Sequence, residues 1–286
     1  MKKTRQFLFV AASLLIVAAV IFVSCSKDSN DVANPKNEVA LQVNHQLGCK
    51  LLPENVYMGI PVTEDLTSTL KVLPTSVNLT TPPVGNQGGE GSCVAWGTTY
   101  AARSIAWRAA NPAAWSYSVN IFSPEYVYNQ IKAGGCADGS YVTDGLDLLR
   151  NQGVVPWSVM PYSDANGCST MPTTAQRTTA ANYRIAGYSR VSLTTTAIKT
   201  QLAAGKPVIV AGPVNNAFVN LTGTTVLGRF TGSSLGGHCY CVVGYDNSRN
   251  AFKVQNSWGT TWGSSGFGYI NYSYITSWWQ EAYVFN

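Results

Sequence analysis

The stretch Asn86-Gln87-Gly88-Gly89-Glu90-Gly91-Ser92-Cys93-Val94-Ala95-Trp96 decides how the chain is organised. Its glycines predict a turn, and apolar residues then recur at helical spacing as far as Asn111-Pro112, so a helix is expected to begin near Cys93. Backbone N–H groups and the helix dipole favour a thiolate in a first turn. Gln87 lies upstream across the glycine turn, so its side-chain amide can fold back and hold a developing oxyanion beside the sulfur.

The rest of the chain predicts helices first and strands afterwards. Ser123-Pro124-Glu125 has the residues of a helix start, and a third helical pattern containing Val142 and Leu146 ends at Gly153. Apolar strand patterns then occupy residues 206–214, 238–245, 252–257 and 266–272. This order predicts an α+β protein of two lobes with a cleft between them.

Histidine is scarce, which narrows the choice of a partner for Cys93. The chain contains two histidines, and His45 lies in the N-terminal extension. His238 is therefore the candidate imidazole, although a lone histidine at the start of a strand is more often a structural residue. Asn256, in Gln255-Asn256-Ser257-Trp258-Gly259, is a candidate to accept the imidazole N–H and fix its tautomer.

Several segments together resemble the papain-like cysteine peptidases. Gln87 to Trp96 is similar to the family's Gln-Gly-x-Cys-Gly-Ser-Cys-Trp-Ala-Phe, with Glu90 in place of the first cysteine and Val94 in place of the tryptophan. The other matches are to the family's mature start, its Gly-Cys-Asn-Gly-Gly loop, its histidine strand and its Asn-Ser-Trp-Gly segment, at residues 73–79, 134–140, 238–245 and 256–259.

The resemblance implies a fold, a mechanism and a set of site residues. It implies a helical lobe over residues 73–185 and an antiparallel β-barrel-like lobe over 186–286, with the active-site cleft between them. It implies an endopeptidase that cleaves protein or peptide substrates through a thioester without a cofactor. Cys93 would be the nucleophile, His238 the acid and base, Asn256 its orienting partner and Gln87 an oxyanion donor. The residues expected to contact substrate are Asp138, Gly139, Ser140, Gly237 and Trp258.

The seven cysteines constrain one another. If Cys25 is lipidated and Cys93 is free, at least one of the other five is unpaired. The resemblance favours a disulfide between Cys136 and Cys168, because each aligns with one half of a different family disulfide whose other half is missing here. Cys49 is then the odd thiol.

His238-Cys239-x-Cys241 looks like a set of metal ligands, but neighbouring strand residues face opposite ways, so no metal is expected.

The N-terminus predicts export. Residues 1–24 read as a signal peptide with a basic start and an uncharged run from Phe7 to Val23. Phe22-Val23-Ser24-Cys25 resembles a bacterial lipobox, which implies an outer-membrane lipoprotein anchored through Cys25, on the periplasmic face or the cell surface. The alternative is an uncleaved transmembrane anchor. Residues 25–72 are expected to form a tether and a short N-terminal extension or pro-segment.

Composition excludes some partners and leaves other functions open. Charged residues are 12% of the chain, and without the three basic residues of the leader 16 basic residues face 14 acidic ones, a net charge of +2. This balance argues against nucleic acid as a partner, and a monomer is expected.

Two other functions are considered: a cell-wall peptide amidase or endopeptidase, and an inactive peptidase fold that binds at the surface. Gly236 and Gly237, with Ala211, are expected to leave a roomy specificity pocket.

Overall fold

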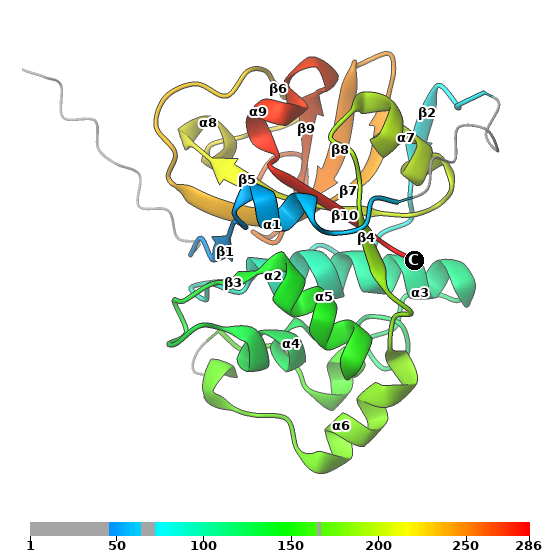
Figure 1. The fold of residues 1–286 in the computed structure, drawn as a ribbon, viewed down its shortest axis with the longest axis vertical. Coiled ribbons are helices and arrows are strands. Elements are labelled where there is room, and N and C mark those ends of the chain that lie inside the picture. The colour runs from blue at the N-terminus through cyan, green and yellow to red at the C-terminus, as the bar shows by residue number, and fades with distance from the viewer. Residues whose placement is uncertain (1–45, 64–71, 165–166) are drawn as a thin grey trace, which may run out of the picture. The chain divides into compact units, whose positions relative to one another are not determined.

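The computed structural model describes residues 46–63, 72–164 and 167–286, which belong to one compact unit. Its first half is mainly helical and its second half mainly sheet, so the predicted two-lobed α+β class is correct (Figure 1). The predicted signal peptide 1–24, Cys25 and the spacer that follows it lie outside the described residues. Within the residues described, no helix is long and apolar enough to cross a membrane.

The helical half is built around the helix that begins at the nucleophile candidate. A short helix in the N-terminal extension, α1 (Glu54–Met58), precedes it. The others are α2 (Cys93–Ala95), η2 (Trp96–Arg103), α3 (Ser104–Ala110), α4 (Pro124–Ile131), α5 (Val142–Asn151) and α6 (Thr174–Ala180), with short 3₁₀ turns at η3 (Trp157–Val159), η4 (Gly167–Ser169) and η5 (Ala181–Tyr183). The three helices expected from the sequence are all present. Ser123 caps α4 as its residue type predicts, accepting the N–H of Tyr126 at 3.1 Å.

The first helix differs from its prediction in one respect: its central turns, η2, are π-helical. Two side chains bond back to the carbonyls of the preceding turn. The Thr98 hydroxyl donates to the Val94 carbonyl at 2.7 Å, and that of Ser104 to the Thr99 carbonyl at 3.5 Å. Such bonds compete with the backbone ladder and loosen it, which favours the wider winding.

The sheet of the second half contains eight strands in the order β4-β10-β5-β7-β8-β9-β6, with β2 also paired to β7. Neighbours are antiparallel except β6 and β9. The strands are β2 (Ser76–Asn78), β4 (Tyr188–Arg190), β5 (Val208–Val214), β6 (Val226–Leu227), β7 (Gly236–Asp246), β8 (Ala251–Gln255), β9 (Phe267–Asn271) and β10 (Glu281–Phe285). Three short helices accompany them: α7 (Thr195–Ala203), α8 (Asn216–Val219) and α9 (Ile275–Trp278), with a 3₁₀ turn, η6 (Tyr272–Tyr274), before α9.

Strand β7 is buried on both faces and divides the core. Cys239, Cys241 and Val243 belong to the cluster shared with the helical half, whereas Tyr240 and Val242 belong to the cluster inside the β lobe. This alternation is the period of two expected of a strand. A Cβ built on Gly97 of η2 would lie 2.8 Å from the Cys239 sulfur, so the helix packs closely on this strand. The sheet thereby fixes the helix that carries Cys93.

Candidate active site

Cys93 is the first residue of α2, at the position expected, and it is fully buried. The preceding residue, Ser92, does not cap the helix with its side chain. Its hydroxyl instead pairs with the Tyr162 hydroxyl at 2.7 Å, which in turn donates to the Gln87 carbonyl at 2.8 Å. The turn before the helix is thus held by a tyrosine from the loop that follows η3.

His238, in β7, pairs with Asn256, which directly follows β8. His238 Nε2 and Asn256 Oδ1 are 2.8 Å apart. The backbone N–H of Ser257 also points at Asn256 Oδ1, at 2.8 Å, and a backbone N–H can only donate. This contact identifies Oδ1 as the acceptor, so Nε2 carries the proton that it shares with Asn256. Nδ1 is consequently the ring nitrogen that would exchange a proton with a nucleophile.

Aromatic rings enclose the imidazole. Trp258 stacks on His238 with centroids 4.5 Å apart and planes at 27°, and Phe218 meets the ring edge-on at 5.9 Å. Both side chains are buried. They exclude water from the His238–Asn256 hydrogen bond, which strengthens it. Trp258 was expected to contact substrate and to cover the hydrogen bond between His238 and Asn256, and its stacking on the imidazole agrees with the second expectation.

Gln87 is fixed at both ends of its amide. Its Oε1 accepts from the Ser257 hydroxyl at 2.7 Å, and its backbone N–H donates to the Ser257 carbonyl at 2.8 Å. Its Nε2 donates to the carbonyls of Glu90, at 2.9 Å, and Gln46, at 2.8 Å. The amide donor is therefore held by the loop after Asn256, and it already binds a peptide carbonyl.

The Gln46 carbonyl belongs to a segment, residues 46–50, that the sequence analysis did not assign to the site. Residues 46–50 lie across the expected substrate-binding residues, and their strand β1 (Cys49–Lys50) pairs in parallel with β3 (Ser140–Tyr141). The Ser140 N–H donates to the Gly48 carbonyl at 2.9 Å. Figure 1 shows β1 beside β3, between the helices and the sheet.

Three glycines let this segment approach closely. A Cβ on Gly48 would lie 1.9 Å from the Gly91 carbonyl oxygen, and one on Gly139 would lie 1.8 Å from the Gly48 carbonyl oxygen. On Gly237 it would meet the Cys49 carbonyl oxygen at 2.2 Å. No Cβ fits at any of these distances. Of the residues expected to touch substrate, Gly139, Ser140 and Gly237 thus contact the 46–50 segment.

Asp138, also expected to contact substrate, makes hydrogen bonds to its own loop and to α4. Its carboxylate accepts the N–H of Gly135 at 2.7 Å, and its carbonyl accepts from the Tyr128 hydroxyl at 2.7 Å. It therefore shapes the loop between α4 and β3 and holds Gly139 in position. The strand in the 46–50 segment was not predicted, because it is two residues long and its partner lies far along the chain.

The expected low pKa of Cys93 is wrong for this arrangement. Burial raises the pKa of the Cys93 thiol to about 11, against smaller lowering contributions from backbone groups of Cys239, Gly48 and Val94. The helix terminus was expected to favour the thiolate, but desolvation opposes the charged form and outweighs it here. Part of that burial comes from the 46–50 segment, whose Gly48 backbone is among the groups that act on the sulfur.

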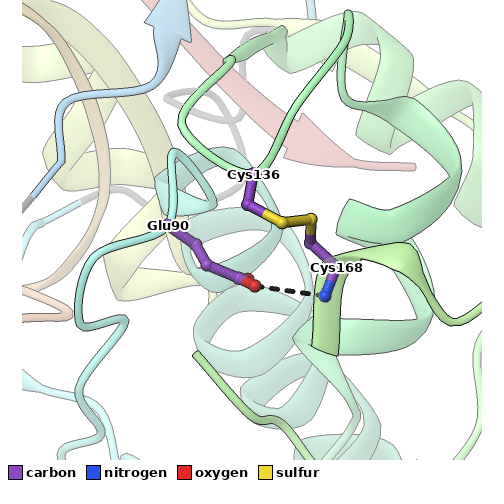
Figure 2. A group of neighbouring side chains, drawn as sticks. All are labelled: Glu90, Cys136 and Cys168. Atoms are coloured by element: carbon purple, nitrogen blue, oxygen red, sulfur yellow. Dashed lines mark hydrogen bonds between the residues drawn. A yellow bond between two sulfur atoms is a disulfide. The ribbon is translucent and has the colours of Figure 1, made fainter. Parts of the chain in front are cut away.

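A disulfide joins Cys136, in the loop before β3, to Cys168 in η4, with Cα atoms 5.6 Å apart. This is the pair that the family resemblance favoured. Figure 2 shows Glu90 beside it, where Glu90 Oε1 accepts the N–H of Cys168 at 3.1 Å. A carboxyl thus occupies the space of the family's missing cysteine. Burial raises the pKa of Glu90 to about 7.

Two clusters resemble metal sites, and their geometry argues otherwise. The ligand atoms of Glu90, Cys136 and Cys168 lie within 4.8 Å of one another, but the two sulfurs are bonded together. Cys239 and Cys241 lie in the core cluster shared with the helical half, whereas the ring of His238 packs against Phe218, a residue of the β-lobe cluster, so the three side chains do not converge on one point. Of the cysteines described, the free ones are Cys49, Cys93, Cys239 and Cys241.

Residues 73–280 match the sequence model of the papain family cysteine proteases. The chain is 30% identical over 190 residues to gamete and mating-type specific protein A of Dictyostelium discoideum, which covers 65% of this chain and 39% of that protein. It is 29% identical over 210 residues to Peptidase 1 of Euroglyphus maynei, which covers 69% of this chain and 61% of that protein. The match spans less than two thirds of both relatives.

Solved structures are similar over more of the chain. Xylellain, a cysteine protease from Xylella fastidiosa, is 25% identical with a TM-score of 0.70, over 85% of this chain and 96% of that one. The proform of the ragweed cysteine protease Amb a 11 has a TM-score of 0.68 at 19% identity, over 85% of this chain and 75% of that one. At 19% identity, the similarity to the Amb a 11 proform concerns the fold alone.

Proposed function

The chain belongs to the papain family of cysteine proteases, and on that premise we propose that it is a cysteine endopeptidase acting through Cys93, His238, Asn256 and Gln87. The observation that carries the proposal is the Gln87 amide, which is locked by Ser257 and donates to a peptide carbonyl beside the helix that starts at Cys93. Such a preorganised donor is what a tetrahedral oxyanion requires.

The reaction would proceed in two halves. His238 Nδ1 takes the proton of the Cys93 thiol as the sulfur attacks the scissile carbonyl carbon. The oxyanion is held by the Gln87 amide and the Cys93 N–H, and loss of the former is expected to cost about 10²–10³ in kcat. His238 then protonates the leaving amine as the C–N bond breaks. Water, deprotonated by His238, attacks the thioester and releases the acid and the thiol.

We further propose that the described form is latent, with the 46–50 segment acting as the inhibitory part of the N-terminal extension. The segment fills the positions that a substrate would need at Gly139, Ser140 and the Gln87 amide. It also keeps Cys93 buried, where its thiol stays protonated. Activity should therefore require displacement of the segment or its proteolytic removal.

The test is cleavage of a mixed peptide library, read by mass spectrometry, with the full chain and two variants. Gly48→Val places a side chain where the Gly91 carbonyl lies, so it should expel the segment. We expect cleavage by Gly48→Val at least tenfold above the unmodified chain, and none by the double variant Gly48→Val/Cys93→Ala. Lys50→Ala is the matched control, because Lys50 is exposed in the same strand.

The other outcomes separate the alternatives. Cleavage confined to cell-wall peptides would identify the amidase or cell-wall endopeptidase. Binding of peptides by Gly48→Val without turnover would identify a surface binding protein on a peptidase fold. If the unmodified chain and Gly48→Val both cleave peptides, at equal rates, latency would be refuted and the peptidase proposal would stand.

A further inference from the structure

A buried carboxyl with one unpartnered oxygen lies beside the Cys136–Cys168 disulfide. A carboxyl oxygen of Glu90 and both sulfurs lie within 4.8 Å of one another, and Figure 2 shows the end of the Glu90 side chain beside Cys168. Glu90 is 1% exposed. Its Oε1 accepts the Cys168 N–H at 3.1 Å, whereas its Oε2 has no hydrogen-bond partner among the described residues. Burying such an oxygen costs free energy, so its place beside the sulfurs needs a reason.

The surroundings of Glu90 favour its protonated form. Neither ion pair found in the described part of the chain includes it. The titratable groups that face it are two carboxyls and two phenols: Glu125, Asp164, Tyr128 and Tyr162. The Tyr162 hydroxyl donates its proton to the Gln87 carbonyl, at 2.8 Å. Burial, together with the two nearby carboxyls, raises the pKa of Glu90 to about 7, so near neutral pH it holds a proton that it can give away.

The two sulfurs of the disulfide differ in their access to solvent. Cys136 is half-buried, in a loop whose residues Gly135 and Ala137 are exposed, whereas Cys168 is 2% exposed. A Cβ built on Gly135 would have a carboxylate oxygen of Asp138, at 3.8 Å, as its nearest neighbour, so the loop is open there. A thiolate from solution can therefore reach the Cys136 sulfur, and exchange then expels the Cys168 sulfur. A thiolate left at that buried position is costly unless it takes up a proton.

We propose that the Cys136–Cys168 disulfide is a thiol–disulfide exchange site for an external dithiol, with the Glu90 carboxyl as its proton donor. A thiolate of the dithiol attacks Cys136 Sγ, and a new S–S bond forms there as the Cys136–Cys168 bond breaks. The electron pair of the broken bond goes to Cys168 Sγ, which takes the proton of the Glu90 carboxyl.

The second half of the exchange completes the balance. The other thiol of the dithiol loses its proton and attacks the mixed disulfide, and Cys136 leaves and becomes a thiol. The dithiol is thereby oxidised to a disulfide, the protein disulfide is reduced to two thiols, and the Glu90 carboxylate regains a proton from water. This chemistry goes beyond the proposed peptidase function and is measured without turnover.

The test follows reduction of the folded full chain by dithiothreitol. Samples are quenched in acid and alkylated, and mass spectrometry measures the peptides that carry Cys136 and Cys168. The background is Cys93→Ala, so the nucleophile does not take part. With Glu90 intact, the rate constant per dithiothreitol thiolate should fall at least about tenfold between pH 6 and pH 8.5, because Glu90 loses its proton. In Glu90→Gln it should be independent of pH and at least about tenfold below the parent value at pH 6.

A matched variant and a stability measurement keep packing effects apart. Asp164→Asn removes an exposed carboxyl that faces Glu90, so its rate should still fall with pH as in the parent. The same pH profile in Glu90→Gln and the parent would overturn the proposal. Faster reduction of Glu90→Gln at every pH, with a lowered Tm at pH 5, would assign Glu90 a packing role and overturn it as well.

Two further measurements test the route of attack. The reduction rate should be first order in dithiothreitol, and a rate independent of its concentration would mean that the disulfide reacts only after unfolding, which would overturn the proposal. With glutathione as a monothiol probe, the trapped mixed disulfide should be on Cys136. Trapping on Cys168 would overturn the role of Glu90, because the expelled sulfur would then be that of half-buried Cys136, which can take its proton from water.

Discussion

At the scale of single residues, one substitution changes the chemistry beside the oxyanion donor. Glu90 stands where the family has a cysteine, and its carbonyl accepts from the Gln87 amide at 2.9 Å. Its carboxyl lies against the Cys136–Cys168 disulfide (Figure 2). The turn that positions Gln87 thus contains a titratable carboxyl, that of Glu90, in place of a disulfide-forming cysteine.

That exchange predicts a dependence of stability on pH. Burial raises the pKa of Glu90 to about 7 from about 4.5, so the folded state binds the proton more tightly than the unfolded state. The stabilisation is fully present below pH 4.5 and is lost as the pH rises through 7, for a total of up to about 3 kcal/mol. Glu90→Gln does not titrate, so its Tm should match that of the parent at pH 5 and exceed it by several degrees at pH 8.5. Parallel Tm curves for the two proteins would contradict this.

At the scale of elements, we propose that the two-residue strand β1 covers the nucleophile and holds it in its buried state. The 46–50 segment is held by the pairing of β1 with β3, by the hydrogen bond from Gln87 Nε2 to the Gln46 carbonyl and by Cys49, which lies in the core cluster. Because β1 has only two residues, we expect it to open at a smaller cost in free energy than the central strands of the sheet. Its opening lets water reach Cys93.

Alkylation of Cys93 measures this opening. With a thiol pKa of about 11, roughly one thiol in ten thousand is ionised at pH 7, and the reaction rate should rise about tenfold per pH unit until the pH approaches 11. In Gly48→Val the sulfur regains water, its pKa falls, and iodoacetamide should label the Cys93 peptide at least tenfold faster at pH 7. Lys50→Ala should react like the parent. Identical rates and pH profiles in Gly48→Val and the parent would show that the segment does not mask the thiol.

At the scale of the whole molecule, local patterns predicted the elements but not the long-range contacts. The helix at Cys93, the Ser123 cap of α4 and the core strands follow from spacing and residue type, and the segments around Gln87 and Asn256 indicated the family. The position of the 46–50 segment could not be predicted, because it depends on tertiary pairing with Ser140. The pKa of Cys93 depends on burial, which a motif does not encode.

The tether is also a property of the whole molecule, and we propose that lipid on Cys25 holds the enzyme at the membrane. A Cys25→Ala variant expressed in a Gram-negative host should lose incorporation of labelled palmitate and pass from the membrane fraction to the soluble one. Cys49→Ser is the matched control and should keep both the label and the membrane fraction. Retention of Cys25→Ala in the membrane would indicate an uncleaved transmembrane anchor.

The place of β10 in the sheet has a consequence for biosynthesis. β10 is made after every other strand of the sheet, yet it lies between β4 and β5 and carries Glu281, which binds the Leu52 N–H. Leu52 and Glu281 are 229 residues apart, so a ribosome adding about 5–20 residues per second makes them roughly 10–45 s apart. Neither the pairing of β10 with β4 and β5 nor the hydrogen bond from the Leu52 N–H to Glu281 can form in that interval. The completed sheet and the hydrogen bond that joins Leu52 of the extension to β10 therefore arise in the same late step of synthesis.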